Sequence, residues 1–265
     1  MGGGICARAK GSWRKACQVF RIFLFLEPCA CCLKPFESFP DFIDGIGFCW
    51  LINIGTKLLY ITEALMKEPF VDFMKKELTP KTVLIACGLP ASYKTETTEV
   101  IAELKGYRIL RSDLIRLEVL KNEDIFDEKV AANMKKRTRV YDEMFRMAHE
   151  LAGKGQGIIL DATFVNQALR RRAAEVAAEN RMNFVIQQTQ CPKAVSLDRI
   201  SKRTKENYES NALTEQAYTN NLKKFETVDL EDLKNLHPQL NIVHLLVDTT
   251  SDLTEEWYVV SRVTR

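Results

Sequence analysis

Residues 83–95 read VLIACGLPASYKT, an apolar run of strand type followed by a loop that starts at a glycine and then by a helical pattern. Such a loop presents backbone N–H groups and a helix N-terminus to phosphate oxygens, while its lysine neutralises charge and its threonine can hold Mg²⁺. The stretch therefore predicts a phosphate-binding loop. The residues expected to contact the phosphates are Gly88, Ala91, Ser92, Tyr93, Lys94 and Thr95.

One position departs from the usual pattern, because Tyr93 stands where a glycine normally precedes the lysine. Ala91 also stands where a small flexible residue is common. A tyrosine can still offer its N–H, but its side chain must point away from the phosphates, and a positive φ would strain it. The alternative left open is a strand-to-helix turn with an incidental Lys94-Thr95 pair.

Around this loop, short apolar runs alternate with longer helical patterns, which predicts an α/β fold with a parallel sheet covered by helices. Five strands are predicted, at Val83–Cys87, Tyr107–Leu110, Gly157–Asp161, Phe184–Thr189 and Ile242–Val247. The helices between them are predicted at Glu96–Lys105, Val130–Ala152, Gln167–Glu179, Pro192–Arg203 and Thr214–Phe225.

Acidic residues follow two of these strands, at the edge where an open α/β sheet binds ligands. Asp113, after the second strand, can take the proton of an attacking hydroxyl as a general base, and Arg116 can hold an acidic substrate. Asp161, at the end of the third strand, can bind Mg²⁺ together with Thr95. The alternative for both acids is a helix cap or a turn residue.

Two arginines precede the polar stretch at residues 204–211. Arg199 and Arg203 are four residues apart, so they share one helix face and can close over a triphosphate as a lid. Lys94, Asp113, Arg199 and Arg203 are therefore the predicted catalytic set. The alternative for the arginines is a solvated helix face.

The first 76 residues differ from the rest and are predicted to form a Cys-rich, apolar extension of residues 77–265. Met66 and Met74 are also plausible start sites, which would place the extension outside the natural product. Its apolar run at residues 45–61 is 17 residues long and contains Asn53 and Lys57, so a membrane helix within residues 19–61 is not favoured, but it stays open. The cysteines do not have zinc-site spacing. Six of the eight cysteines lie in this part, at Cys6, Cys17, Cys29, Cys31, Cys32 and Cys49.

The charge balance limits the classes of partner. Residues 66–265 carry 31 Lys/Arg and 30 Asp/Glu, so an extended basic footprint for duplex nucleic acid is absent. The apolar run at residues 19–26 is interrupted by Arg21 and ends at Glu27-Pro28, which makes a poor signal peptide. A cytoplasmic protein is expected.

The whole series of motifs resembles one known group, the AAA-type predicted P-loop kinases, which are related to polynucleotide 5′-kinases and zeta-toxin kinases. The resemblance spans about residues 80–250 and includes the order and spacing of the motifs. The motifs are Gly88-Leu-Pro-x-x-x-Lys94-Thr95, Arg111-Ser-Asp113-x-x-Arg116, Leu160-Asp161-Ala-Thr-Phe164, Arg199-x-x-x-Arg203 and Glu209-Ser-Asn-Ala212.

This resemblance implies a P-loop NTPase of adenylate-kinase-like architecture, with five parallel strands in the order 2-3-1-4-5 and helices on both faces. The N-terminal extension that precedes it is expected to be helical or disordered. It also implies ATP and Mg²⁺ as cofactors, and transfer of the γ-phosphoryl group to a hydroxyl of a small molecule or a nucleic-acid end. Asp113 would be the base, Arg116 a substrate contact, and Arg199 and Arg203 the lid. The alternative function is a nucleotide-binding switch or degenerate kinase, for which Tyr93 is the main argument.

Overall fold

The computed structural model describes residues 50–54, 57–61, 66–123, 130, 133–203 and 214–265. All of these fall within Gly47–Arg265, one of the two units into which the chain divides. The expectations for residues 1–49, including six cysteines and the first apolar run, lie outside the described residues. The same is true of the motif at 209–212.

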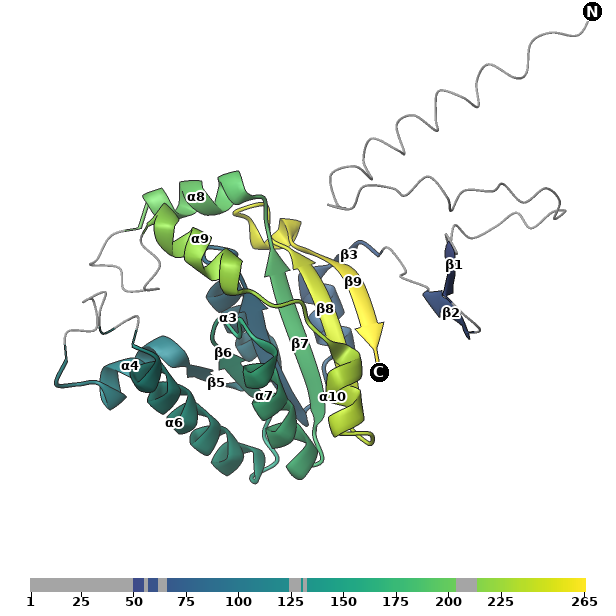
Figure 1. Cartoon of the computed structure of the whole chain (residues 1–265), viewed down its shortest axis with the longest axis horizontal. Helices are drawn as coiled ribbons and strands as arrows, with labels where there is room; N and C mark the ends of the chain where they lie inside the picture. Colours follow the sequence, from purple (N-terminus) through teal and green to yellow (C-terminus); the bar gives the residue numbers. More distant parts are fainter. Residues whose placement is uncertain (1–49, 55–56, 62–65, 124–129, 131–132, 204–213) are drawn as a thin grey trace, which may run out of the picture. The chain divides into compact units, whose positions relative to one another are not determined.

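A seven-stranded sheet with the order β3-β9-β8-β7-β4-β6-β5 forms the centre of the domain (Figure 1). Five neighbouring strands are parallel, and in chain order they run 2-3-1-4-5, so the predicted parallel sheet and the implied strand order are confirmed. The central strand, β4, is buried along its whole length, which explains the apolar run in its sequence. The five are β5 (Arg108–Arg111), β6 (Ile158–Asp161), β4 (Thr82–Gly88), β7 (Asn183–Gln190) and β8 (Ile242–Asp248).

Two further strands, which the sequence analysis missed, extend the sheet beyond β8. β9 (Tyr258–Thr264) pairs antiparallel with β8, and β3 (Glu68–Pro69) pairs antiparallel with β9. β3 leads directly into α2 (Phe70–Glu77), whose Phe70 and Met74 side chains are fully buried. The sheet domain therefore includes residues from 68 onward, earlier than the predicted boundary at residue 77.

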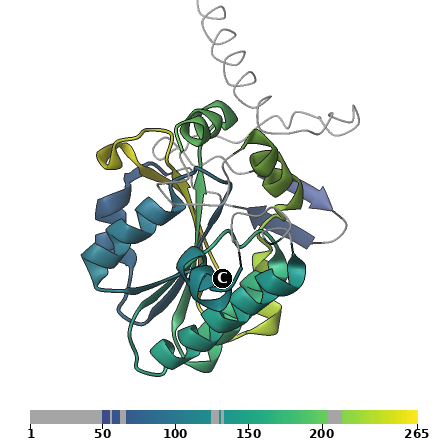
Figure 2. The same ribbon diagram turned by 90° about the vertical axis from the view of Figure 1, so that its left-hand side faces the viewer.

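Helices cover both faces of the sheet, as predicted (Figure 2). On one face, Val83 and Ile85 of β4 belong to a core shared with α6 (Met134–Ala152), α7 (Gln167–Glu179) and α10 (Leu230–Leu236). On the other face, Leu84 belongs to a core shared with α2 and α3 (Lys94–Lys105). Because successive strand residues point to opposite faces, β4 contributes to both cores.

The remaining helices lie near the carboxyl ends of the parallel strands. α4 (Ser112–Val119) begins directly after the last residue of β5. α8 (Lys193–Ser201) and α9 (Glu215–Lys224) meet in a small core in which Ile200 and Tyr218 pack with Ala91. This core places the C-terminal end of α8 beside residues 88–95.

Residues 50–54 and 57–61 form a separate two-stranded antiparallel sheet of β1 (Trp50–Ile54) and β2 (Lys57–Ile61). The described part of this apolar run is therefore strand, and not the membrane helix that the sequence analysis left open. Its sequence, WLINI and KLLYI, is rich in β-branched and aromatic residues, which favour strands. Among the residues that the structure describes, no helix is long and apolar enough to cross a membrane.

Candidate functional site

The phosphate loop is built by β4, which ends at Gly88, and α3, which begins at Lys94. Gly88 has a φ of 143°, and a Cβ there would lie 2.6 Å from the Thr189 carbonyl oxygen and 2.7 Å from Thr189 Oγ1. Only glycine fits at this close approach of the loop to β7. The loop is also held by Ser92, whose Oγ donates to the Leu89 carbonyl at 2.8 Å and lies 2.7 Å from Thr189 Oγ1.

Two residues of the loop have left-handed backbone geometry without being glycine. The φ angles are 59° for Ala91 and 55° for Tyr93. For an L-residue with a Cβ this conformation costs roughly 1–2 kcal/mol. The strain foreseen for Tyr93 is therefore present, and the contacts of its side chain must offset it.

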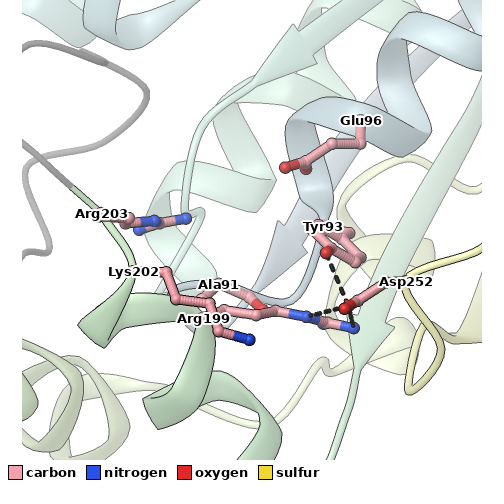
Figure 3. Close-up of a pocket in the computed structure, with 7 residues that line it drawn as sticks. All are labelled: Ala91, Tyr93, Glu96, Arg199, Lys202, Arg203 and Asp252. Atoms are coloured by element: carbon pink, nitrogen blue, oxygen red, sulfur yellow. Dashed lines mark hydrogen bonds and ion pairs between the residues drawn. The ribbon is translucent and has the colours of Figure 1, made fainter.

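The Tyr93 side chain makes those contacts on the flank of the loop (Figure 3). Its hydroxyl donates to Asp252 Oδ1 at 2.8 Å, and its ring centroid lies 5.6 Å from that of Trp257. The guanidinium carbon of Arg199 lies 3.7 Å from the Tyr93 ring centroid, a cation–π contact. Burial raises the pKa of the Tyr93 hydroxyl to about 12, with a further contribution from the Asp252 hydrogen bond, so the hydroxyl stays a donor at neutral pH.

Arg199 is 7% exposed and joins three segments of the chain. Its Nη1 donates to the Ala91 carbonyl at 3.2 Å, and its Nη2 donates to the Thr249 carbonyl at 2.9 Å. Its Nε donates to Asp252 Oδ1 at 3.0 Å. The solvated helix face considered in the sequence analysis does not describe this side chain, which ties α8 to the phosphate loop and to the loop after β8.

Lys94 lies within the loop that it was expected to serve. Its Nζ donates to the Leu89 carbonyl at 2.7 Å. Burial lowers its pKa, while the nearby carboxylates of Asp161 and Glu96 oppose that shift. An ammonium group that has lost most of its hydration is a strong partner for an incoming phosphate.

The two predicted metal ligands come together at the ends of β4 and β6. Thr95 Oγ1 donates to Asp161 Oδ2 at 2.8 Å, and the Asp161 side chain is 6% exposed. Burial raises the pKa of Asp161, because the nearby positive charges and hydrogen bonds do not fully compensate for the lost hydration of its carboxylate. A hydroxyl and a carboxylate oxygen are ligands that suit Mg²⁺, so these two residues fit the ion. Among the described residues, no group of three or more metal-ligating side chains occurs.

Arg111, which the sequence analysis did not single out, lies beside this pair. Its Nε is 3.8 Å from Asp161 Oδ2, and its Nη2 pairs with Glu99 of α3. The register of the sheet puts Arg111 opposite Asp161 on neighbouring parallel strands. The rule that ligand sites form at carboxyl ends of strands could have identified Arg111, since it is the last residue of β5.

Asp113 and Arg116 lie three residues apart on α4. Burial raises the pKa of Asp113, and the charges that act on it belong to Arg116, Asp161, Lys94 and Arg203. Both residues thus share one electrostatic environment with the phosphate loop. Arg116 is 8% exposed, and its Nε and Nη1 are buried without a hydrogen-bond partner among the described residues.

Beside the phosphate loop is a pocket of about 260 Å³. Arg203 lies at one end of it and Asp252 at the other (Figure 3). Asp252 is the second residue that the sequence analysis missed, because it lies 159 positions from its partner Tyr93 and no local pattern links the two. The pocket is lined by Ala91, Tyr93, Glu96, Arg199, Lys202, Arg203 and Asp252.

Comparison with known proteins places this geometry in a family. A family model described as an AAA domain matches residues 83–228. Similar solved structures include a sugar kinase from Janibacter sp. HTCC2649, at 15% identity and a TM-score of 0.46, over 63% of this chain and 86% of that chain. A gluconokinase from Sinorhizobium meliloti 1021 is 17% identical with a TM-score of 0.47, over 67% of this chain and 88% of that chain. A comparison with curated proteins finds no match.

The matched segment covers more than half of the chain. It contains the phosphate loop, Asp113, Asp161, Arg199 and Arg203, in the order that the sequence analysis used. The chain therefore belongs to the AAA domain family and has the P-loop kinase-like fold that its sequence predicts.

Proposed function

We propose that this protein transfers the γ-phosphoryl group of ATP to a hydroxyl group of an acceptor that also carries an anionic group. The acceptor class is a small molecule or a nucleic-acid end. The observation that carries the proposal is that Arg116 and Lys94 both lie close enough to Asp113 for their charges to lower its pKa, against the larger effect of burial. A base candidate, an anion-binding candidate and a phosphate loop are the parts that phosphoryl transfer to a hydroxyl needs.

In the proposed reaction, Asp113 accepts the proton of the acceptor hydroxyl. The acceptor oxygen forms a bond to the γ-phosphorus, and the bond from the γ-phosphorus to the β–γ bridging oxygen breaks, so its electron pair leaves with ADP. Burial raises the pKa of Asp113 above its ordinary value, which makes it a better proton acceptor once it is ionised.

The remaining candidate residues hold the donor. Residues 88–95 surround the phosphates with N–H groups, and Lys94 and Arg203 contribute positive charge where charge develops. Thr95 and Asp161 would hold Mg²⁺, which when bound neutralises charge on the phosphate oxygens. Arg199, with its bonds to Ala91 and Thr249, is better suited to fix the shape of the loop than to close as a lid.

Arg116 supports the anionic character of the acceptor. A guanidinium group that is buried with two unpartnered nitrogens needs an explanation, and an anionic ligand supplies it. A phosphate or carboxylate on the acceptor would accept from Nε and Nη1 and so bring the hydroxyl toward Asp113.

The test is Asp113→Asn, with Glu118→Gln on an exposed part of the same helix as the matched control. Transfer of labelled γ-phosphate from ATP is measured with Mg²⁺ over a panel of hydroxyl compounds, half of them phosphorylated or carboxylated. We expect Asp113→Asn to lower the rate by about 10²–10⁴-fold with ATP affinity unchanged. Equal activity of Asp113→Asn and Glu118→Gln would contradict the role of the base.

A second candidate function is a nucleotide-binding switch, and Tyr93 is the observation that favours it. Its strained backbone and its contacts with Asp252 and Trp257 stiffen the loop where turnover needs adjustment. A switch would bind ATP through Lys94 and transfer phosphate to no compound of the panel. In either case a nucleotide is the ligand, and the expected cytoplasmic location suits both.

A further inference from the structure

The pocket beside the phosphate loop has the position and size for the base of a nucleotide. Ala91 and Tyr93 belong to both the loop and the pocket, so a triphosphate seated on residues 88–95 has this space next to it. The volume of about 260 Å³ is slightly below the range of roughly 300–1,000 Å³ that drug-sized ligands occupy, which suits one base with part of its sugar.

Asp252 gives this pocket a hydrogen-bond acceptor with a fixed position. Among the described residues, the contacts to its carboxylate all end on one oxygen, Oδ1, which accepts from the Tyr93 hydroxyl and from Nε of Arg199 and forms an ion pair with Nη2 of Arg199. The side chain is nevertheless 65% exposed and lines the pocket. The hydrogen bonds of Tyr93 and Arg199 lower the pKa of Asp252, so the carboxylate is ionised and can only accept.

Tyr93 is the residue that fixes this acceptor, and a glycine at its position could not do so. Its hydroxyl holds Oδ1 at 2.8 Å while its ring packs between Trp257 and the Arg199 guanidinium. Both neighbours of the ring are nearly buried, with exposed fractions of 3% for Trp257 and 7% for Arg199. The tyrosine therefore orders the wall of the pocket as well as the loop.

From this arrangement we propose that Asp252 and Tyr93 set the nucleobase preference of the site. The second oxygen of Asp252 accepts a hydrogen bond from an N–H donor on the edge of a purine base, and Tyr93 is the positioning residue for that carboxylate. The inference rests on the proposed function, because it requires that a nucleotide occupy residues 88–95. A base without edge N–H donors leaves the second oxygen of Asp252 without this partner, and the site discriminates against it.

The first experiment compares four probes on the full chain by calorimetry with Mg²⁺. These are ATP, GTP, the triphosphate of unsubstituted purine riboside, which has no N–H donor on its base edge, and inorganic tripolyphosphate, which has no base. We expect ATP or GTP to bind about tenfold more tightly than the purine riboside triphosphate, the value of one hydrogen bond to a charged group. The comparison of ATP with GTP identifies which purine supplies the donor.

Two variants then assign the preference to residues. Asp252→Asn should bring the affinity ratio between the preferred nucleotide and the purine riboside triphosphate close to one, and Tyr93→Phe should lower it several-fold. The matched controls are Asp72→Asn on α2 and Tyr258→Phe on β9, which should leave the ratio at the wild-type value. The ratio is the decisive quantity because a purely structural role of Tyr93 would weaken all four probes together.

Three results would overturn the inference, and they can be told apart. If wild-type protein binds ATP, GTP and the purine riboside triphosphate equally well, the base edge is not recognised, while the proposed phosphate site stands. If none of the four probes binds, the proposed function fails and the inference fails with it. An unchanged ratio in Asp252→Asn would assign the preference to another residue.

Discussion

Arg199 and Arg116 are almost equally buried, with exposed fractions of 7% and 8%, but they differ in how their nitrogens are used. Every nitrogen of Arg199 donates to a protein atom, including the carbonyls of Ala91 and Thr249. In Arg116, Nε and Nη1 have no partner among the described residues. Under the proposed function, the nucleotide side of the site is completed by the chain itself, whereas on the acceptor side a ligand would complete the hydrogen bonds of Arg116.

The largest expected effect comes from a substitution in the phosphate loop at its closest approach to β7. Gly88→Ala places a Cβ 2.6 Å from the Thr189 carbonyl at a φ of 143°, so the loop and β7 must separate. We expect a loss of about 4 kcal/mol in the free energy of unfolding, measured by denaturant titration.

The matched control for Gly88→Ala is Gly106→Ala. Gly106 also has a positive φ, of 68°, but a Cβ there meets nothing within 4 Å. It should cost about 1 kcal/mol. Similar losses for both variants would show that the close approach at Gly88 does not limit the loop.

A second substitution, Arg199→Met, removes hydrogen bonds on the nucleotide side and keeps most of the side-chain volume. The carbonyls of Ala91 and Thr249 lose their donor, and the Tyr93 ring loses its cation. We expect a loss of about 3 kcal/mol in the free energy of unfolding without any ligand. The measurement is thermal and denaturant unfolding of the unliganded chain, and a loss below about 1 kcal/mol would contradict the account of Arg199 as a structural tie.

Some elements of the fold could be predicted from the sequence and others could not. The strand Ile242–Val247 agrees with β8 to within one residue, because its sequence, IVHLLV, is apolar at every position except His244. α4 was missed because it begins directly after β5, with no turn residues between Arg111 and Ser112. β9 was missed because only one of its residues, Val259, is buried.

Within the site, local patterns predicted the residues but not their partners. The phosphate loop, Asp113 and Asp161 follow from strand ends and loop spacing. The bond from Tyr93 to Asp252 joins residues far apart in sequence, and only the folded chain brings them together. Arg170 is a second example. It is the first of three consecutive arginines, a residue type that is usually exposed, but it is fully buried and donates to the Glu226 and Thr227 carbonyls.

The role proposed for Arg116 can be tested with Arg116→Met, for which a small effect on the free energy of unfolding is expected. Because two nitrogens of Arg116 have no partner, their removal costs little, and the free energy of unfolding should change by no more than about 1 kcal/mol. Saturating inorganic phosphate should stabilise Asp113→Asn more than the double variant that also carries Arg116→Met. A large loss in Arg116→Met without ligand would make Arg116 a structural residue like Arg199.

The smallest expected effect is a shift in pH dependence that links Asp113 to Arg116. Burial raises the pKa of Asp113 above its ordinary value of 3.8, and the charge of Arg116 opposes that rise. The rate of transfer should therefore increase with pH through the raised pKa, and Arg116→Met should move this limb to higher pH. A pH profile of kcat/KM for both proteins tests the shift, and coincident profiles would contradict it.

The same pKa makes a prediction about stability that needs no acceptor. A carboxyl group whose pKa is raised on folding stabilises the protein below pH 3.8, and this contribution is lost as the pH rises through the raised pKa. At neutral pH, ionised Asp113 is therefore a destabilising group, and Asp113→Asn should unfold at a higher temperature than wild type while Glu118→Gln should not. A base that costs stability when ionised is what a site selected for reactivity would contain, whereas a helix cap would lose stability on the same substitution.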